Sequence, residues 1–209
     1  MEINDSAWDS QSAVDALVNA ITKDSDSVAT GSRYQGYHHD VITARFRHAI
    51  GRILLALVQF RKPSIAGMQS RISGEYLGHT LAFDARIATA DTTFSFDNMR
   101  TGLPASAGIT CLLPRYIGIG RAMSLVQSGL TIDAREAHSI GLITDIVDDQ
   151  NELAERCLET IKGITSSPHR HLAEYHRQHI LPPASEIKAA LEQYYDAMAR
   201  SIIQLRKNR

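Results

Sequence analysis

Residues 94–147 constrain the fold of this chain more than any other segment. After a short extended piece the pattern becomes helical beyond Pro104, and Gly118 and Gly120 open a predicted helix that Gly129 closes. Asp133 then provides an N-cap for a second, short helix, and Gly141 follows it as the residue that terminates a helix in left-handed backbone. Residues 142–147 (L-I-T-D-I-V) are mostly apolar and predict a strand. The segment therefore alternates strands with helices.

The rest of the chain extends this alternation and then becomes helical. Helices are predicted over residues 10–22, 41–60, 150–164, 168–180 and 185–206, strands over 64–68 and 92–96, and a helix end that leads into a strand over 81–89. This order indicates an α/β core, residues 1–165, followed by a C-terminal helical region, residues 166–209. The last helix carries a broad apolar stripe, and we expect that stripe to be used for oligomerisation.

Composition excludes several classes of protein. The chain has 209 residues, of which 44% are hydrophobic, so it can bury one sizeable core. Its net charge is -1 and its cations are scattered, which argues against a nucleic-acid partner. Residues 53–58 form the longest strongly apolar run and are far too few to cross a bilayer. The acidic N-terminus has no secretory pattern, and we expect a cytoplasmic protein without membrane partners.

Four short motifs follow one another in a fixed order. They are residues 60–66 (F-R-K-P-S-I-A), 83–88 (F-D-A-R-I-A), 102–115 (G-L-P-A-S-A-G-I-T-C-L-L-P-R) and 130–143 (L-T-I-D-A-R-E-A-H-S-I-G-L-I). Together they resemble the crotonase (enoyl-CoA hydratase/isomerase) superfamily, over roughly residues 10–165. The resemblance implies an α/β fold with the ClpP/crotonase spiral core. The strand hairpin with which the superfamily usually begins has no match, which implies an N-terminally reduced core.

The resemblance also implies a site for an acyl thioester. Members of the superfamily stabilise the enolate of the thioester with two backbone N–H groups that form an oxyanion hole. The first matching position is Tyr37, which follows Gly36 in a glycine motif. The second is Glu75 by ungapped counting from residues 83–84, or Gly74 with a slip of one residue.

The acids of ordinary hydratases have no counterpart in this chain. Gly78 and Asn98 occupy the positions of the two hydratase acids, and Ser106 occupies that of a third acid used by dienoyl isomerases. Addition of water to a double bond needs a general acid and a general base within hydrogen-bond reach of that water. We therefore do not expect simple hydration.

One branch of the superfamily lacks these acids and is still active. Residues 68–70, 166–169, 179–180 and 191–193 resemble the decarboxylases and dehydratases of polyketide β-branching cassettes. This resemblance implies a lyase that acts on an acyl group linked to CoA or to an acyl carrier protein. It implies no cofactor beyond the CoA or phosphopantetheine of the substrate, no metal, and a homotrimer or hexamer.

Side chains near the implied site supply the remaining candidates. His38 adjoins the first oxyanion position, with His39 beside it, and either could give a proton to an α-carbanion. His79 lies next to the vacant acid position, and Asn98 could bind a carboxylate or a water molecule as a neutral substitute. Two other functions remain open. One is a non-catalytic subunit that binds a thioester or a partner enzyme, and the other is an isomerase with Glu75 or His79 as its base.

Overall fold

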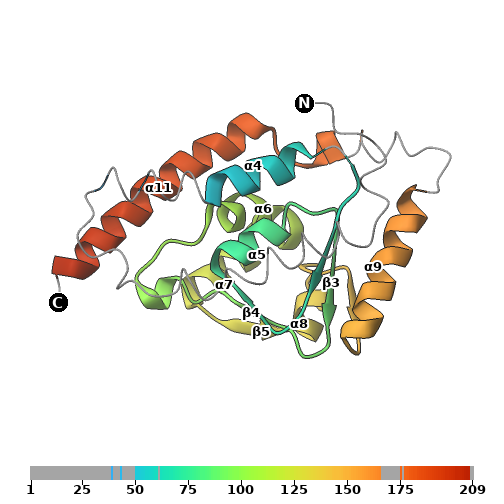
Figure 1. Cartoon of the computed structure of the whole chain (residues 1–209). Coiled ribbons are helices and arrows are strands. Elements are labelled where there is room, and N and C mark those ends of the chain that lie inside the picture. Colours follow the sequence, from blue (N-terminus) through green and yellow to red (C-terminus); the bar gives the residue numbers. More distant parts are fainter. Residues whose placement is uncertain are drawn as a thin grey trace. The chain divides into compact units, whose positions relative to one another are not determined.

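The computed structural model describes residues 39, 43, 50–60, 62–165, 175 and 177–207, all of which belong to the compact unit 36–209 (Figure 1). The predicted helix over residues 10–22 and most of the one over 168–180 lie outside these residues. The predicted reduction of the N-terminal sheet also concerns residues outside them. Within the described residues, strands and helices alternate, and the α/β prediction is confirmed.

Two three-stranded sheets form the core. One sheet has the order β1 (Ile65–Met68), β3 (Ala85–Thr89), β6 (Asp145–Val147), with all neighbours parallel. The other has the order β2 (Arg71–Ser73), β4 (Thr93–Ser95), β5 (Thr131–Asp133), with β5 antiparallel to β4. Every residue of the central strand β3 is buried, as expected for a parallel strand that is covered on both faces.

Successive strands step from one sheet into the other. β1 leads into β2 through Ser70, which has a left-handed φ of 62°. β3 leads into β4 through a turn at residues 90–92. At this corner the Thr92 hydroxyl donates to the Met68 carbonyl over 3.2 Å, and the Thr93 N–H donates to the Ser70 carbonyl over 2.9 Å. The same step taken twice makes the chain coil between the sheets.

Helices cover these sheets and pack on one another. They are α4 (Arg52–Gln59), α5 (Gly74–Thr80), α6 (Ala107–Ile117), α7 (Ile119–Ser128), α8 (Ala134–Ser139), α9 (Gln150–Thr165) and α11 (Ala184–Lys207), with a 3₁₀ turn η4 at Met99–Thr101. α9 lies along the sheet β1-β3-β6, and α11 runs beside α4, as Figure 1 shows. The predicted caps are present, because the Asp133 carboxylate accepts from the Glu136 N–H over 2.8 Å and Gly141 has a φ of 80°.

The predicted strand over residues 142–147 is twice as long as the observed strand. Only Asp145–Val147 pairs with β3. The first apolar residues of the segment complete the end of α8 instead, where the Leu142 N–H donates to the Ala137 carbonyl over 2.9 Å. The Leu142 carbonyl in turn accepts from Arg86 Nε over 2.7 Å, so this backbone is already paired and cannot join the ladder.

Most of the apolar stripe of α11 is buried within the chain, where α11 contacts α4 and α6. Leu205 is 40% exposed, and the other members are at most 7% exposed. These buried residues are Leu191, Tyr194, Tyr195, Met198 and Ile202. Periodicity identifies a buried face but not the surface that covers it, and self-association through this helix stays a prediction.

A buried arginine fastens the start of the C-terminal region to the core. Arg177 is 6% exposed, and its Nη1 lies 2.5 Å from Asp84 Oδ1. Its other nitrogens donate to the carbonyls of Phe60, Leu57 and Ala82 over 2.7, 2.6 and 2.9 Å. The ends of α4 and α5 are thus held by one guanidinium. The proposed division of the chain at residue 165 stays a prediction.

Across the described residues, no helix combines the length and the apolar character that a membrane crossing requires.

Candidate functional site

The first turn of α5 offers backbone donors at the position where the oxyanion hole is predicted. Gly74 and Glu75 are the first two residues of the helix, so their N–H groups have no intrahelical acceptor. Ser73 precedes them in extended backbone, and its side chain makes no capping hydrogen bond. A Cβ added to Gly74 would meet nothing within 4 Å, which means that the space beside this turn is open. Gly74 itself needs a left-handed φ of 56°.

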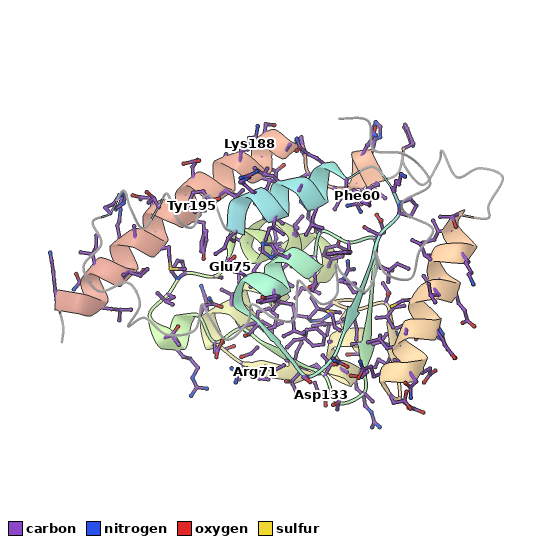
Figure 2. All side chains as sticks on the ribbon, viewed as in Figure 1. Phe60, Arg71, Glu75, Asp133, Lys188 and Tyr195 are labelled. Atoms are coloured by element: carbon purple, nitrogen blue, oxygen red, sulfur yellow. The ribbon has the colours of Figure 1, made fainter. Side chains whose placement is uncertain are left out.

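The Glu75 side chain reaches the C-terminal helix. Its Oε1 accepts a short hydrogen bond from the Tyr194 hydroxyl, which comes from α11, 119 residues later in the chain. Burial raises the pKa of Glu75 to about 7, and the hydrogen bond from Tyr194 opposes part of that rise. Figure 2 shows Glu75 at α5 and Tyr195, the neighbour of Tyr194, on α11. The site therefore combines backbone donors with a carboxyl group that titrates near neutrality.

His79 lies one turn after Glu75 but is directed toward the start of α4. It is 7% exposed, and its Nε2 lies 3.3 Å from the Ile50 carbonyl, which assigns the proton to Nε2. Burial lowers the pKa of His79 to about 4, so the imidazole is neutral at physiological pH. Next to this contact, a Cβ on Gly51 would come within 1.6 Å of the Tyr195 hydroxyl oxygen. The catalytic role of His79 stays a prediction.

The vacant acid position at Gly78 is filled by a helix contact. A Cβ there would lie 2.2 Å from Ser106 Oγ and 3.3 Å from the backbone of Gly108. A Cβ on Gly108 would in turn lie 2.4 Å from the Gly78 carbonyl oxygen. These two glycines let α5 and α6 approach closely. Ser106, in the third acid position, is fully buried and caps α6 by accepting from the Ile109 N–H.

Asn98 closes the loop between β4 and α6. Its Nδ2 donates to the Pro104 carbonyl over 3.3 Å, and its own carbonyl accepts from the Leu103 N–H over 2.9 Å. The opposite orientation of the amide would place Oδ1 against the Pro104 carbonyl oxygen, so Nδ2 is the atom that faces Pro104 and Oδ1 points away from it. That oxygen is buried without a hydrogen-bond partner among the described residues. It can accept a hydrogen bond but cannot act as an acid or a base.

The first oxyanion position and the histidine beside it are not among the described residues. Tyr37 and His38 lie outside the described residues, and their roles stay predictions. His39 is described, and its Nε2 lies 3.2 Å from Asp196 Oδ1 on α11. Asp196 also pairs with Arg200 over 2.6 Å. In the described part of the chain, no three His, Cys, Asp or Glu side chains gather closely enough to hold a metal ion.

Comparison with known proteins identifies relatives of the whole described core. A family profile described as "Enoyl-CoA hydratase/isomerase" matches residues 26–202. The enoyl-CoA hydratase ACTT3 of Alternaria alternata is 28% identical over 175 residues, which cover 78% of this chain and 59% of that protein. The enoyl-CoA hydratase AFT3-1 of the same organism is 34% identical over 118 residues, which cover 56% of this chain and 40% of that protein.

A solved structure shares the fold. The crystal structure of enoyl-CoA hydratase from Bacillus halodurans matches 90% of this chain and 70% of its own chain, with a TM-score of 0.70 and 23% identity. At that identity the likeness concerns the fold alone, and it confirms the predicted crotonase-like α/β core. The chain spans 59% and 40% of the lengths of the two Alternaria relatives.

Proposed function

Because the chain belongs to the enoyl-CoA hydratase/isomerase family, we propose that it binds an acyl thioester and stabilises the enolate of that thioester at the start of α5. The proposed reaction is a decarboxylation or a dehydration rather than a hydration. The acyl group is carried by CoA or by an acyl carrier protein. The proposal includes a cytoplasmic homotrimer or hexamer, as the resemblance implies.

The packing of Gly78 is the observation that carries this choice of reaction. The close approach of α5 and α6 leaves no space for an acidic side chain at that position. The second acid position, Asn98, holds an amide that is engaged in its loop. Hydration needs both an acid and a base on the attacking water. Loss of carbon dioxide needs less, because the electron pair of the broken C–C bond stays on the substrate and can be delocalised onto the thioester oxygen.

The start of α5 supports this chemistry with donors rather than with acids. When carbon dioxide leaves, the bonding pair stays on the substrate and moves toward the thioester oxygen. The N–H of Glu75 or Gly74 would hold that oxygen as its charge develops. A proton must then be added to the carbon skeleton to give the product, so the site also needs a proton donor.

An isomerase is the second candidate, and the Glu75 carboxyl favours it. A group with a pKa of about 7 can take a proton from one carbon and return it to another at neutral pH. This reaction uses the same enolate and the same backbone donors. The two candidates differ in whether a group leaves the substrate.

A substrate panel tests the proposal. Glutaconyl, 3-hydroxyacyl and 3-enoyl thioesters are each supplied on CoA and on an acyl carrier protein, and products are followed by mass spectrometry. Decarboxylation of the glutaconyl thioester with negligible crotonoyl-CoA hydration is expected. Hydration with kcat within tenfold of the ordinary enzyme range of about 1–10³ s⁻¹ would contradict the proposal. Binding of thioesters without any turnover would favour a non-catalytic subunit instead.

A further inference from the structure

The Glu75 carboxyl and the Tyr194 hydroxyl form a pair that the proposed decarboxylation steps leave unused. We propose that Glu75, held by Tyr194, is the catalytic acid that protonates the carbon of the enolate at this site. This inference rests on the proposed function and names the proton donor which that function lacks. It assigns two roles to one residue, since the Glu75 N–H binds the oxygen and its carboxyl serves the carbon.

Covalent structure places the two groups together. The Glu75 carboxyl is joined to its own N–H by a short aliphatic stem, so a thioester oxygen bound at that N–H lies within a side chain's length of the carboxyl. The space beside the helix start is open at Gly74. A positioned acid close to the reacting carbon converts proton transfer into a step within the complex.

One carboxyl oxygen is used for positioning and the other remains for chemistry. Oε1 accepts from Tyr194, while Oε2 has no hydrogen bond to the described residues. Glu75 is only partly buried, and Oε2 is not among the buried side-chain oxygens without a partner. The free oxygen therefore keeps some exposed surface on which a ligand can act.

The surroundings keep the carboxyl protonated near neutrality. Burial is the largest cause of the raised pKa of Glu75, about 7, and no cation offsets it. His79 on the same helix is neutral at that pH because burial lowers its pKa to about 4. On packed elements, Arg71 of β2 pairs with Asp97, and Arg115 of α6 pairs with a carboxylate of α11. An acid whose pKa is near the working pH is the most effective proton donor.

The proton balance is simple. Departure of carbon dioxide leaves an electron pair delocalised between carbon and the thioester oxygen. The proton on Glu75 Oε2 moves to the carbon, a C–H bond forms, and the O–H bond breaks. The carboxylate that remains accepts the hydrogen bond from Tyr194, which stabilises the charge. Water from the solvent returns a proton to Glu75 before the next cycle, and no oxidant or reductant is required.

Two variants with matched controls test the pair. E75Q keeps the backbone N–H and removes the acid, and Y194F removes the hydroxyl that positions it. E155Q on the exposed face of α9 and Y195F, one residue along α11, are the controls. The decarboxylation rate should fall by about 10²–10⁴-fold in E75Q and by a smaller factor in Y194F, with the controls unchanged. The alkaline decline of the wild-type rate near pH 7 should disappear in E75Q.

Stereochemistry separates a proton donor from a structural residue. In deuterium oxide the wild type should place deuterium on one face of the product carbon, and E75Q should give both faces, because solvent then supplies the proton. Thermal unfolding of each variant reports on its fold. A rate within threefold of wild type, with deuterium still on one face in E75Q, would overturn the assignment.

A direct titration keeps the inference testable if the proposed reaction is wrong. If the wild type turns over no thioester, the carboxyl carbons of Glu-labelled protein are followed by NMR with and without an unreactive thioether analogue of acyl-CoA. A Glu75 pKa near 7 that shifts when the analogue binds, and that changes in Y194F, supports an acid at the ligand site. A pKa near 4.5, or one that ignores the analogue, overturns it.

Discussion

Glu75 and His79 show how burial acts in opposite directions on two groups of one short helix. Burial disfavours the charged form of each side chain, so it raises the pKa of the carboxyl to about 7 and lowers that of the imidazole to about 4. Both groups are therefore neutral in the folded protein between these values. Neutrality lets α4, α5 and α11 pack around them without a buried charge.

The two shifts should have opposite effects on stability. From pH 4.5 to 7 the folded state keeps a proton on Glu75 that the unfolded state has lost, so the free energy of unfolding falls as pH rises. From pH 4 to 6.5 the unfolded state carries a proton on His79 that the folded state lacks, so the same free energy rises. Each slope is at most about 1.4 kcal/mol per pH unit, and they oppose each other between pH 4.5 and 6.5.

Single variants should expose each slope. In H79Q the free energy of unfolding should fall from pH 4.5 to 6.5 relative to wild type, and in E75Q it should rise. Urea unfolding at several pH values in that window measures the difference. Parallel curves for all three proteins would contradict the burial of these groups.

Gly78 should tolerate no side chain. In G78A the new methyl meets Ser106 Oγ, which caps α6, and the backbone of that helix, so we expect a loss of about 1–3 kcal/mol. Gly163 in α9 is the matched control, because a Cβ there meets nothing within 4 Å. G163A should be more stable than wild type by about 0.5–1 kcal/mol through helix propensity. Urea midpoints compare the two, and equal effects would contradict the close contact of α5 with α6.

At the scale of elements, local patterns predicted what local physics decides. The Asp133 cap and the Gly141 helix end follow from residue type and spacing, and both are observed. The helical period also predicts the apolar stripe of α11, but a period does not identify the surface that covers it. The pair of Tyr194 with Glu75 joins residues 119 apart and leaves no local signal in the sequence. The sequence predicts Glu75 as a backbone donor and as a possible base, but not its pairing with Tyr194.

The hydrogen bonds of Arg177 are also not predictable from the sequence, because the oxygens that accept them come from separate elements. R177M would leave Asp84 and three carbonyls without this partner, and breaking a buried ion pair costs about 3–5 kcal/mol. R115M is the control, since Arg115 and Glu186 are 44% and 46% exposed and such pairs contribute about 0–1 kcal/mol. Thermal unfolding should separate the variants. Similar losses in both would contradict the role of Arg177.

At the scale of the whole molecule, the trimer or hexamer stays a prediction, and Leu205 is a member of the α11 stripe that is exposed on the single chain. Sedimentation at micromolar concentration should give a species well above the 23.1 kDa of one chain. A single 23.1 kDa species would contradict the proposed assembly. The thioester site would then be formed by residues of one chain alone.

The central claim is that the backbone N–H of Glu75 stabilises an enolate, and a proline–alanine comparison at this residue tests it most directly. E75A and E75P both remove the carboxyl, but only E75P removes the N–H, and proline is tolerated in the first turn of a helix. We predict that kcat/KM for thioester turnover is about 10²–10³-fold lower in E75P than in E75A, with both variants folded by circular dichroism. Equal kcat/KM values in the two folded variants would contradict the claim.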